Sequence, residues 1–364
     1  MSLKDIIIQK IQQRGPINFH DFMEMALYYP ELGYYSSGRE KIGKKGDFYT
    51  SSNLTSAFGA MIAKQLEEMW GILGEQPFTI VEYGAGTGLL CRDILGYLKN
   101  NRKLFDQLSY CIIEKGDALR KLQQEYLTEK VSWYNDISEI GQINGCVLSN
   151  ELLDNFSVHR VVMTDRLMEV FVDYRNEFSE RLKPASPAVV NYFEELGVDL
   201  PNGYRTEASL EVIHWINEIS AALGKGFLLT IDYGYSSHEL YRPSRSSGTL
   251  MCYNKHELND NPYQDIGQQD ITAHVNFSAL CHWGFKNGLI CCGLTNQGQF
   301  LLSLGFRDHL IRTAEPGKNM IEAARKASII THTLLMDMGT KFKVLIQKKG
   351  LPNQWTPLQG LSGN

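Results

Sequence analysis

The stretch VEYGAGTGLL, residues 81–90, places glycines at positions 84, 86 and 88 directly after an apolar run. Glycine lacks a Cβ and readily adopts left-handed backbone conformations, so this turn lets the backbone approach a ligand closely. Such a turn between a first strand and a first helix is typical of nucleoside-cofactor sites in α/β proteins, although the motif alone is a weak signal. The stretch therefore predicts an α/β fold with a cofactor at the end of a strand over residues 78–84.

Apolar strand-like runs alternate with helix-like periods from about residue 78 onward, which predicts a mostly parallel, doubly wound sheet. The helix-like periods include residues 89–99, 118–127 and 319–335. The predicted strands are residues 78–84, 108–116, 131–135, 145–151 and 226–235. A late, amphipathic run at 341–350 is expected to add an outer strand at the sheet edge, and a late edge strand of this kind fits a seven-stranded sheet.

The predicted chain organisation has three parts. We expect an N-terminal helical segment with a lid over residues 1–75, a cofactor-binding core over 76–350, and a tail over 351–364. Two insertions are expected in the core, at about 156–205, which alternates like an antiparallel hairpin, and at 236–275, which is polar and rich in turns. Both follow the carboxyl ends of strands, where open sheets bind ligands.

Composition restricts the partners and the compartment. The chain has 36 Lys and Arg against 41 Asp and Glu, so no overall positive field gathers phosphates, and nucleic acid is an unlikely partner. The seven cysteines contain no C-x-x-C pair, which indicates a reducing compartment and no zinc site. The N-terminal region has only three consecutive isoleucines, too few for a secretion signal or a membrane span. These features predict a soluble, cytoplasmic protein.

Acidic residues near the ends of the first three predicted strands favour S-adenosylmethionine over a dinucleotide. The glycines are spaced G-x-G-x-G, and Glu82 precedes them, where a pyrophosphate would be repelled but the ammonium and sulfonium charges of this cofactor would be attracted. Glu114 is placed to accept hydrogen bonds from both ribose hydroxyls, as in nicotinamide enzymes too. Asp136 could reach the adenine amino group. The alternative is that Glu82 and Asp136 are solvated acids at strand ends.

Seven further blocks are similar, in the same order, to the MidA-type family of proteins. They are residues 15–35, 43–59, 149–160, 228–234, 270–280, 296–306 and 338–347. The resemblance implies a class I methyltransferase fold. The family includes the mitochondrial complex I assembly factor that is a protein arginine methyltransferase, so the resemblance also implies that activity. This chain differs from the usual family pattern at Thr87 and in the segment after Asp154.

The segment SNELLDN, residues 149–155, follows the fourth predicted strand, beside the expected position of the cofactor's methyl group. Asn150, Glu151 and Asp154 are the catalytic candidates. A guanidinium needs orientation more than activation, and a pair of carboxylates can orient it through bidentate hydrogen bonds. The alternative is that Asn150 caps a turn, Glu151 faces solvent and Asp154 caps a helix.

Other polar and aromatic residues are weaker candidates. Asp47 and Thr50 lie in a stretch suited to a lid over the cofactor, or to a solvated loop. Tyr233 and Tyr235 end the fifth strand and are expected to line a substrate site with His274, or to pack there. His274 and Asp270, four residues apart, could share a helix face, but two ligands do not make a metal site, so no metal is predicted.

Three functions remain open at this stage. A protein arginine methyltransferase is favoured, because long insertions suit a macromolecular substrate. The alternatives are a small-molecule methyltransferase, and a protein that uses bound cofactor structurally while another complex assembles. We expect a protein substrate and no nucleic-acid partner, and a homodimer is possible.

Overall fold

The computed structural model describes residues 1–37, 51–254, 257–313, 320–352 and 357–363. The strand predicted before the glycine turn is present as β2 (Phe78–Tyr83). The chain forms two units, each assembled from three separate segments. Unit 1 contains residues 1–48, 153–216 and 234–283, and unit 2 contains residues 49–152, 217–233 and 284–364. The segments at 156–205 and 236–275 that were predicted as insertions thus fall in unit 1.

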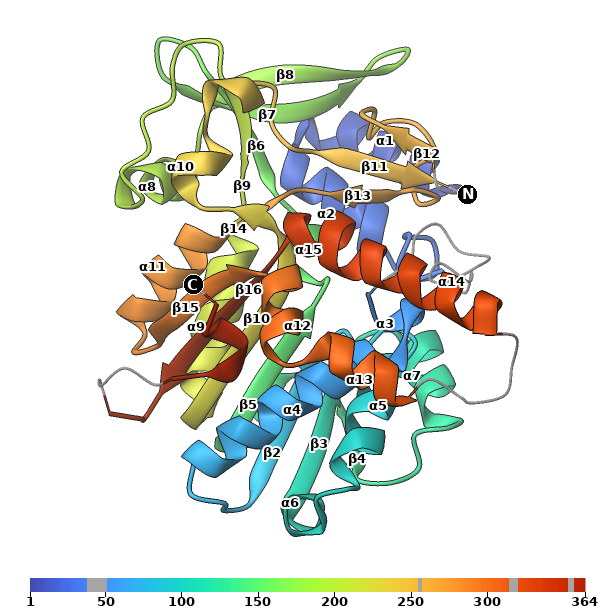
Figure 1. Cartoon of the computed structure of the whole chain (residues 1–364). Helices are drawn as coiled ribbons and strands as arrows, with labels where there is room; N and C mark the ends of the chain where they lie inside the picture. The colour runs from blue at the N-terminus through green and yellow to red at the C-terminus, as the bar shows by residue number, and fades with distance from the viewer. Residues whose placement is uncertain (38–50, 255–256, 314–319, 353–356, 364) are drawn as a thin grey trace. The chain divides into compact units, whose positions relative to one another are not determined.

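A mixed sheet with helices forms unit 2, so the predicted α/β fold is confirmed. The strands follow the order β15-β16-β10-β5-β2-β3-β4, and Figure 1 shows them in this arrangement. The run β10-β5-β2-β3-β4 is parallel, and β16 is antiparallel to both of its neighbours. The other strands are β3 (Leu108–Ile113), β4 (Val131–Tyr134), β5 (Ile143–Asn150), β10 (Leu223–Tyr235), β15 (Ile290–Asn296) and β16 (Phe342–Lys349). An eighth strand, β14 (Val275–Asn276), pairs with the last two residues of β10, in unit 1.

The position of β16 differs from the prediction. The segment was expected at the sheet edge because its run is amphipathic, but it lies between β10 and β15. Val344, Leu345 and Ile346 are all buried, as expected for a strand covered on both faces. Lys348 is also buried and donates from Nζ to the carbonyl of Pro352 at 2.7 Å. The edge strand is β15, which was not predicted.

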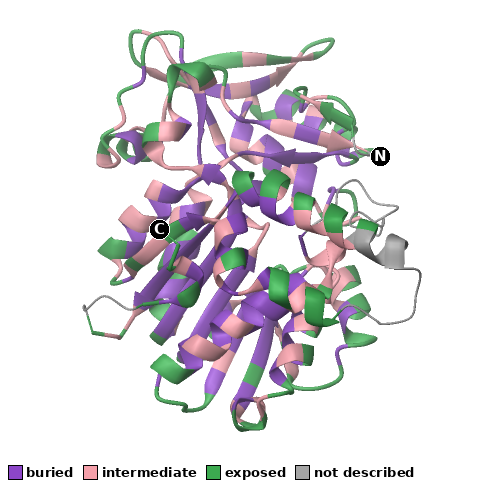
Figure 2. Ribbon diagram, in the orientation of Figure 1, coloured by how far each residue is buried: buried purple, intermediate pink, exposed green. Residues whose placement is uncertain are grey.

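Helices α4 (Ser56–Ile72) and α5 (Leu89–Leu98) supply most of the apolar side chains that pack on this sheet. Thr55 caps α4 by accepting the amide of Ala57. Gly59 allows the two helices to approach closely, because a Cβ there would lie 2.5 Å from Cβ of Asp93. In Figure 2 the central strands and the inner faces of these helices are buried along most of their length.

The remaining helices of unit 2 connect and flank these strands. They are α3 (Ser51–Leu54), α6 (Arg102–Gln107), α7 (Asp117–Gln124), η1 (Ile137–Ile140), α12 (Gln297–Ser303), α13 (Phe306–Thr313), α14 (Met320–His332), the π-helical turn η4 (Thr333–Asp337), α15 (Met338–Lys341) and η5 (Gln359–Leu361). Helices α9 (Glu211–Ala222) and α11 (Phe277–Lys286) begin in unit 1 and end in unit 2. The last described residues pack against α4, where Gly360 donates its amide to Oε1 of Gln65 at 3.0 Å.

Unit 1 is built around a second, antiparallel sheet with the order β1-β7-β6-β9, to which β8 adds beside β7. The segment predicted as a hairpin contributes a three-stranded meander rather than two strands. The strands are β1 (Ile17–Asn18), β6 (His159–Met163), β7 (Leu167–Tyr174), β8 (Phe178–Pro184) and β9 (Arg205–Ala208), and a further small sheet contains β11 (Met251–Asn254), β12 (Glu257–Asn259) and β13 (Asp270–Thr272).

The helices of this unit include α1 and α2, which supply much of its apolar core. Their bounds are α1 (Leu3–Arg14), α2 (Phe19–Tyr28), η2 (Leu153–Asn155), α8 (Pro187–Glu195), α10 (Ser237–Leu240) and η3 (Pro243–Arg245). Ser2 and Asp5 form a capping box at the start of α1.

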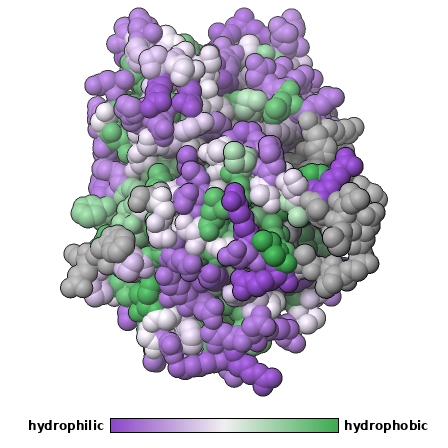
Figure 3. All heavy atoms as spheres, in the orientation of Figure 1, coloured by the Kyte–Doolittle hydropathy of each residue, from purple (hydrophilic) through white to green (hydrophobic). Residues whose placement is uncertain are grey.

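Polar side chains cover most of the face that Figure 3 shows, and apolar side chains lie among them in small groups. Within the described ranges, none of the helices combines the length and apolarity that a membrane span requires.

A charged cluster in unit 1 centres on His20 of α2. Its ring stacks on that of His159 with the centroids 4.8 Å apart. Its two nitrogens lie 3.3 Å from Oδ1 of Asp21 and 3.0 Å from Oε1 of Glu211. Burial alone would lower the pKa of His20, but the hydrogen bonds to the two carboxylates outweigh it and raise the pKa to about 9.

We expect His20→Gln to destabilise the protein in a pH-dependent way. A histidine whose folded-state pKa exceeds its unfolded value contributes its full stability below about pH 6.5 and loses it as the pH rises through about 9. Because both carboxylates are partly exposed, we expect a loss of only about 1–2 kcal/mol at pH 6. Urea unfolding at pH 6, 7.5 and 9.5 measures it, with His238→Gln on exposed α10 as the control. A difference that does not shrink with rising pH would contradict this account.

Candidate functional site

The carboxyl edge of the unit 2 sheet gathers most of the predicted site residues. Parallel strands end at the same edge of a sheet, and ligands bind there in open α/β folds. The glycine turn follows β2, Glu114 follows β3, Asp136 lies two residues after β4, and Glu151 follows β5. Because β10 and β15 are both antiparallel to β16, β15 also ends at this edge, and Gln297 follows it.

The glycine turn has the left-handed backbone that its sequence predicts. Gly84, Gly86 and Gly88 have φ angles of 62°, 54° and 77°. A Cβ at Gly84 would lie 2.8 Å from Cδ1 of Leu152, and one at Gly88 would lie 2.8 Å from Oη of Tyr126. With these positive φ angles, a side chain at either position would strain the backbone and displace its neighbour. The turn leads directly into the N-terminus of α5, where unpaired amides favour an anionic or hydroxyl-bearing ligand.

Glu114 is held in place by its neighbours. It is only 8% exposed, and its Oε1 accepts the amide of Gly116 at 2.8 Å. The side chain of Gln123 donates from Nε2 to Oε2 of Glu114 at 3.3 Å and to the carbonyl of Gly86 at 2.8 Å. Its Oε1 accepts the indole N–H of Trp133 at 2.8 Å. Gln123 thus joins the glycine turn to the acid after β3.

Sequence analysis missed Gln123, although a signal was present. Gln123 lies midway between Leu119 and Leu127 at four-residue spacing, so it occupies the apolar stripe of α7. A polar residue on that stripe, fully buried in the structure, indicates a specific hydrogen-bonding role.

Glu82 and Asp136 lie in opposite environments. Glu82 is 2% exposed, and its Oε2 accepts the hydroxyl of Tyr110 at 2.7 Å. Burial raises the pKa of Glu82 to about 7, with a smaller contribution from the charge of Glu114. Asp136 caps η1, accepting the amide of Ser138 at 2.8 Å and its hydroxyl at 2.5 Å, and these bonds lower the pKa of Asp136. Glu82 is therefore not a solvated acid, whereas the cofactor contacts of both residues stay predictions.

Glu151 has an unusual backbone and a partly buried side chain. Its φ of 53° is left-handed, which is strained for a residue with a side chain. Its Oε1 accepts the amide of Ser51 at 2.9 Å and Nδ2 of Asn150 at 3.2 Å. Burial raises the pKa of Glu151 to about 7, with a contribution from the charge of Asp232, although the two hydrogen bonds act in the opposite direction. Glu151 is therefore only partly exposed, and its catalytic role stays a prediction.

Two more polar groups surround this position. Oδ1 of Asn150 is buried and has no hydrogen-bond partner within the described part of the chain. Asp232, which sequence analysis did not select, is 1% exposed and accepts the amides of Leu152 at 3.1 Å and Tyr233 at 2.8 Å. Asp232 thus holds the backbone that follows Glu151, and an acid inside the apolar run of β10 was the signal for it.

Asp154 belongs to unit 1, where it lies in η2 and is 6% exposed. Its carbonyl accepts the amide of Ala273 at 2.9 Å. The next residue, Asn155, donates from Nδ2 to Oδ1 of Asp270 at 3.1 Å, and Tyr35 donates its hydroxyl to the other oxygen of Asp270 at 2.9 Å. The region is therefore a buried polar cluster that sequence analysis did not foresee.

The predicted substrate-lining residues are divided between the units. In unit 1 the rings of Tyr235 and His274 lie 5.4 Å apart, and the guanidinium of Arg245 lies 3.8 Å over the ring of Tyr235. Burial, and to a lesser extent the charge of Arg245, lower the pKa of His274 to about 4. In unit 2 the ring of Tyr233 packs on that of Phe342.

Two further predictions concerned the pair Asp270 and His274 and the lid residues Asp47 and Thr50. Asp270 and His274 do not share a helix face, because Asp270 lies in strand β13; across the described ranges, no three His, Cys, Asp or Glu side chains are arranged to hold a metal ion. Asp47 and Thr50 lie outside the described residues.

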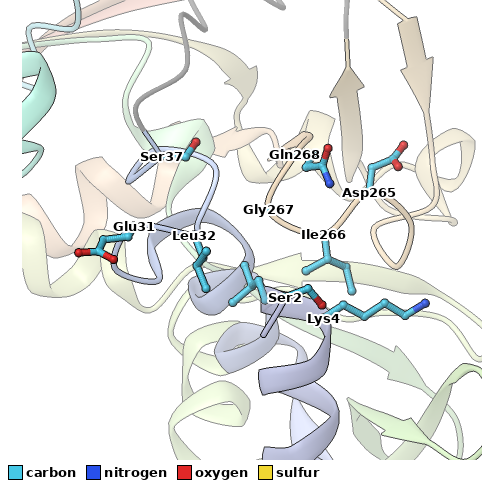
Figure 4. A pocket seen from close by; sticks show the side chains of 10 residues that line it. Ser2, Lys4, Glu31, Leu32, Ser37, Asp265, Ile266, Gly267 and Gln268 are labelled. Carbon is cyan, nitrogen blue, oxygen red and sulfur yellow. The ribbon is translucent and has the colours of Figure 1, made fainter.

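Unit 1 also contains an open pocket of about 630 Å³ at the start of α1 (Figure 4). Ser2, Lys4, Glu31 and Leu32 lie on one side of it, and residues 265–268 lie on the other. None of the predicted site residues lines it. The side chain of Ser2 is already engaged in capping α1, so we assign no ligand to this pocket.

Comparisons with known proteins agree with this geometry. A family model described as "Putative S-adenosyl-L-methionine-dependent methyltransferase" matches residues 61–295. Two relatives are named "Protein arginine methyltransferase NDUFAF7 homolog, mitochondrial". The one from Drosophila melanogaster is 28% identical, and the match covers 96% of this chain and 85% of that protein. The one from Caenorhabditis elegans is also 28% identical, and the match covers 94% of this chain and 85% of that protein.

Two crystal structures from Burkholderia thailandensis are similar over nearly the whole chain. One, described as a "likely methyl transferase" bound to S-adenosyl-homocysteine, is 29% identical with a TM-score of 0.86 and covers 98% of this chain and 94% of that one. The other, of an uncharacterised protein, is 30% identical with a TM-score of 0.87 and covers 99% and 94%.

These matches confirm the predicted family resemblance, and they overturn one prediction. The cytoplasmic location is contradicted, because the fly and nematode relatives are named as mitochondrial proteins. The cysteine pattern on which that prediction rested does not distinguish one reducing compartment from another.

Proposed function

Because the chain belongs to the family of putative S-adenosyl-L-methionine-dependent methyltransferases, we propose that it methylates an arginine side chain of a protein. The chain is an S-adenosylmethionine-dependent methyltransferase, and S-adenosylmethionine is its cofactor. Support for the arginine substrate comes from the names of the fly and nematode relatives and from the chemistry of the residues around Glu151.

The residues at the carboxyl edge of unit 2 fit this cofactor. The left-handed glycine turn provides a backbone cradle, and the carboxylates after β3 and β4 suit ribose hydroxyls and an adenine amino group. We propose that Gly84, Gly86 and Gly88 contact the cofactor through their backbone atoms. Glu114 would accept hydrogen bonds from the ribose hydroxyls, and Asp136 would accept one from the adenine amino group. Glu82 would favour the cationic amino-acid end. When bound, the cofactor supplies an electrophilic methyl group.

The arginine proposal rests on the environment and backbone conformation of Glu151. Its side chain is partly buried, the pKa of its carboxyl group is raised to about 7, and its backbone is strained. A perturbed pKa and a strained backbone both destabilise a fold and are found mainly at functional sites. A guanidinium is always protonated, so its arrival would draw Glu151 into the ionised form and orient the attacking nitrogen through charge-assisted hydrogen bonds.

The same carboxylate can take up the proton that the methylated nitrogen must lose. The new bond between the nitrogen and the methyl carbon would form as the bond between that carbon and the donor's sulfur breaks, with S-adenosylhomocysteine as the neutral leaving group. The nitrogen would then carry an additional positive charge until an N–H proton leaves. A carboxyl group with a pKa near 7 is matched to accept that proton at physiological pH. Oδ1 of Asn150, buried and without a partner in the described part of the chain, would accept a second guanidinium N–H. A catalytic role for Asp154 stays a prediction from its place in the sequence.

We propose further that unit 1 recognises the protein substrate. Segments 156–205 and 236–275 contribute most of its sheets and loops, and added segments of this kind commonly determine specificity. Tyr235 and His274 are our candidates for side chains that contact the substrate. A homodimer stays a prediction.

The expected product is methylarginine in a protein. Purified enzyme with labelled S-adenosylmethionine should label proteins in an extract of a strain that lacks it, and mass spectrometry of the labelled peptides should find the methyl group on arginine. Glu151→Gln enzyme is the control and should leave the same proteins unlabelled. Label on lysine, on glutamine or on a metabolite would refute the arginine proposal and favour one of the alternative functions.

A further inference from the structure

A buried glutamine at the carboxyl edge of unit 2 is linked to Glu151 through one intervening residue. Gln297 begins α12, directly after β15, and is 0% exposed. Its Oε1 accepts the hydroxyl of Ser51 at 3.3 Å, and the amide of Ser51 donates to Oε1 of Glu151 at 2.9 Å. Hydrogen bonds thus link three segments that are far apart in the sequence, from Gln297 through Ser51 to the Glu151 carboxylate.

The backbone around Gln297 has little room to move. Asn296 caps α12 by accepting the amide of Gln299 at 2.8 Å. A Cβ at Gly298 would lie 2.5 Å from the carbonyl oxygen of Leu335, and one at Gly339 would lie 3.0 Å from Cα of Gly298. The start of α12 is therefore tightly packed against the π-helical turn η4 and α15. This packing fixes the position of Gln297, and with it the hydrogen bond to Ser51.

The side-chain amide of Gln297 is only partly hydrogen-bonded in the described part of the chain, which a purely structural role does not explain. Nε2 of Gln297 is buried and has no hydrogen-bond partner within the described part of the chain. A buried amide that is half satisfied is worse for folding than an apolar side chain of the same size. A leucine would fill this space without an unpaired donor, but it would not hold Ser51.

We propose that Gln297 is a positioning residue for the Glu151 carboxylate and acts through Ser51, an inference that rests on the proposed role of Glu151. By fixing Ser51, Gln297 aims an amide N–H at Oε1 of Glu151. A hydrogen bond to the ionised carboxylate stabilises that form, so Gln297 sets both the direction and the protonation state of the group that receives the substrate.

The test measures the protonation of Glu151 without using activity. A titrating carboxyl group makes the free energy of unfolding depend on pH, and Glu151→Gln removes its contribution. The difference in free energy of unfolding between the parent and Glu151→Gln is measured from pH 3 to 9. Its slope against pH returns to zero as Glu151 ionises in the folded state, and the midpoint of this return is the folded-state pKa, about 7 in the native chain. The same pair is then compared in a Gln297→Leu background.

In the Gln297→Leu background we expect the midpoint to move upward by roughly one pH unit, the size of one hydrogen bond to a charged group. Ser51→Ala should move it in the same direction, and the two substitutions together should move it no further, because they break the same contact. Gln65→Leu, at an equally buried glutamine on α4 that does not contact Glu151, should leave it unchanged.

An unmoved midpoint in Gln297→Leu, or shifts that simply add in the double variant, would overturn the inference. These outcomes are distinct from a failure of the proposed function. If Glu151→Gln enzyme methylates protein at the native rate, the role of Glu151 is wrong whatever the midpoint does. If Glu151→Gln is inactive but the midpoint is insensitive to Gln297, only the positioning role fails.

Discussion

Methyl transfer by the Glu151→Gln enzyme is expected to fall by about 10²–10⁴-fold, the range that follows the loss of one positioned catalytic group. The substitution keeps the shape of the side chain but removes the charge that orients a guanidinium and the base that accepts its proton. Affinity for S-adenosylmethionine should be unchanged, because the residues proposed to bind the cofactor lie after other strands of the sheet.

Single-turnover rates and calorimetric titration with the cofactor measure the two quantities separately. In the native enzyme kcat/KM should rise with pH through about 7, as Glu151 loses its proton, and the variant should lack this limb. Glu125→Gln, at an exposed acid in the same unit, is the matched control. Native activity in Glu151→Gln would eliminate this residue from the mechanism.

Thermal unfolding shows whether the variant is folded. Because the folded-state pKa of Glu151 lies above its unfolded value, its contribution to stability is complete below about pH 4.5 and is lost as the pH rises through about 7. Glu151→Gln should therefore unfold at a higher temperature than the native protein at pH 8. Lost activity together with gained stability is the expected sign of a functional site.

Glu114→Ala is expected to weaken S-adenosylmethionine binding by about 1–3 kcal/mol, or roughly 5–150-fold. The carboxylate is buried and held by Gly116 and Gln123, so it is preorganised to accept hydroxyl groups, and the alanine variant loses these bonds. Isothermal titration of the cofactor and of its demethylated product measures the effect.

Asp117→Ala serves as the control, since this exposed acid lies three residues further along, in the first turn of α7. Circular dichroism of both variants checks that the fold persists. If Glu114→Ala binds the cofactor as tightly as the native protein, the ribose assignment is wrong.

Much of the unit 2 sheet could be predicted because its signals are local. Residues 78–84, 108–116, 131–135, 145–151 and 226–235 were predicted as strands, and β2, β3, β4, β5 and β10 lie there. A run of apolar residues specifies a buried strand without reference to any distant segment, and a glycine turn specifies its own backbone. Glu82, Glu114 and Asp136 could be selected as candidates for the same reason, since each lies close in sequence to the end of a predicted strand.

The sequence by itself thus determined the α/β class, the cofactor and the edge of the sheet at which Glu114 and Glu151 lie. Only the tertiary structure decided which strand lies at the edge, because β16 is an inner strand only once β15 pairs with it. It also decided the surroundings of Glu151, because Ser51, 100 residues before it in the chain, donates to its carboxylate, and Gln297, 146 residues after it, accepts the hydroxyl of Ser51. The pattern of strands and the conformation of a turn depend on adjacent residues, so they can be predicted from the sequence. The burial of a side chain, its protonation and the order of strands depend on which distant residues pack together, and only the complete fold determines that.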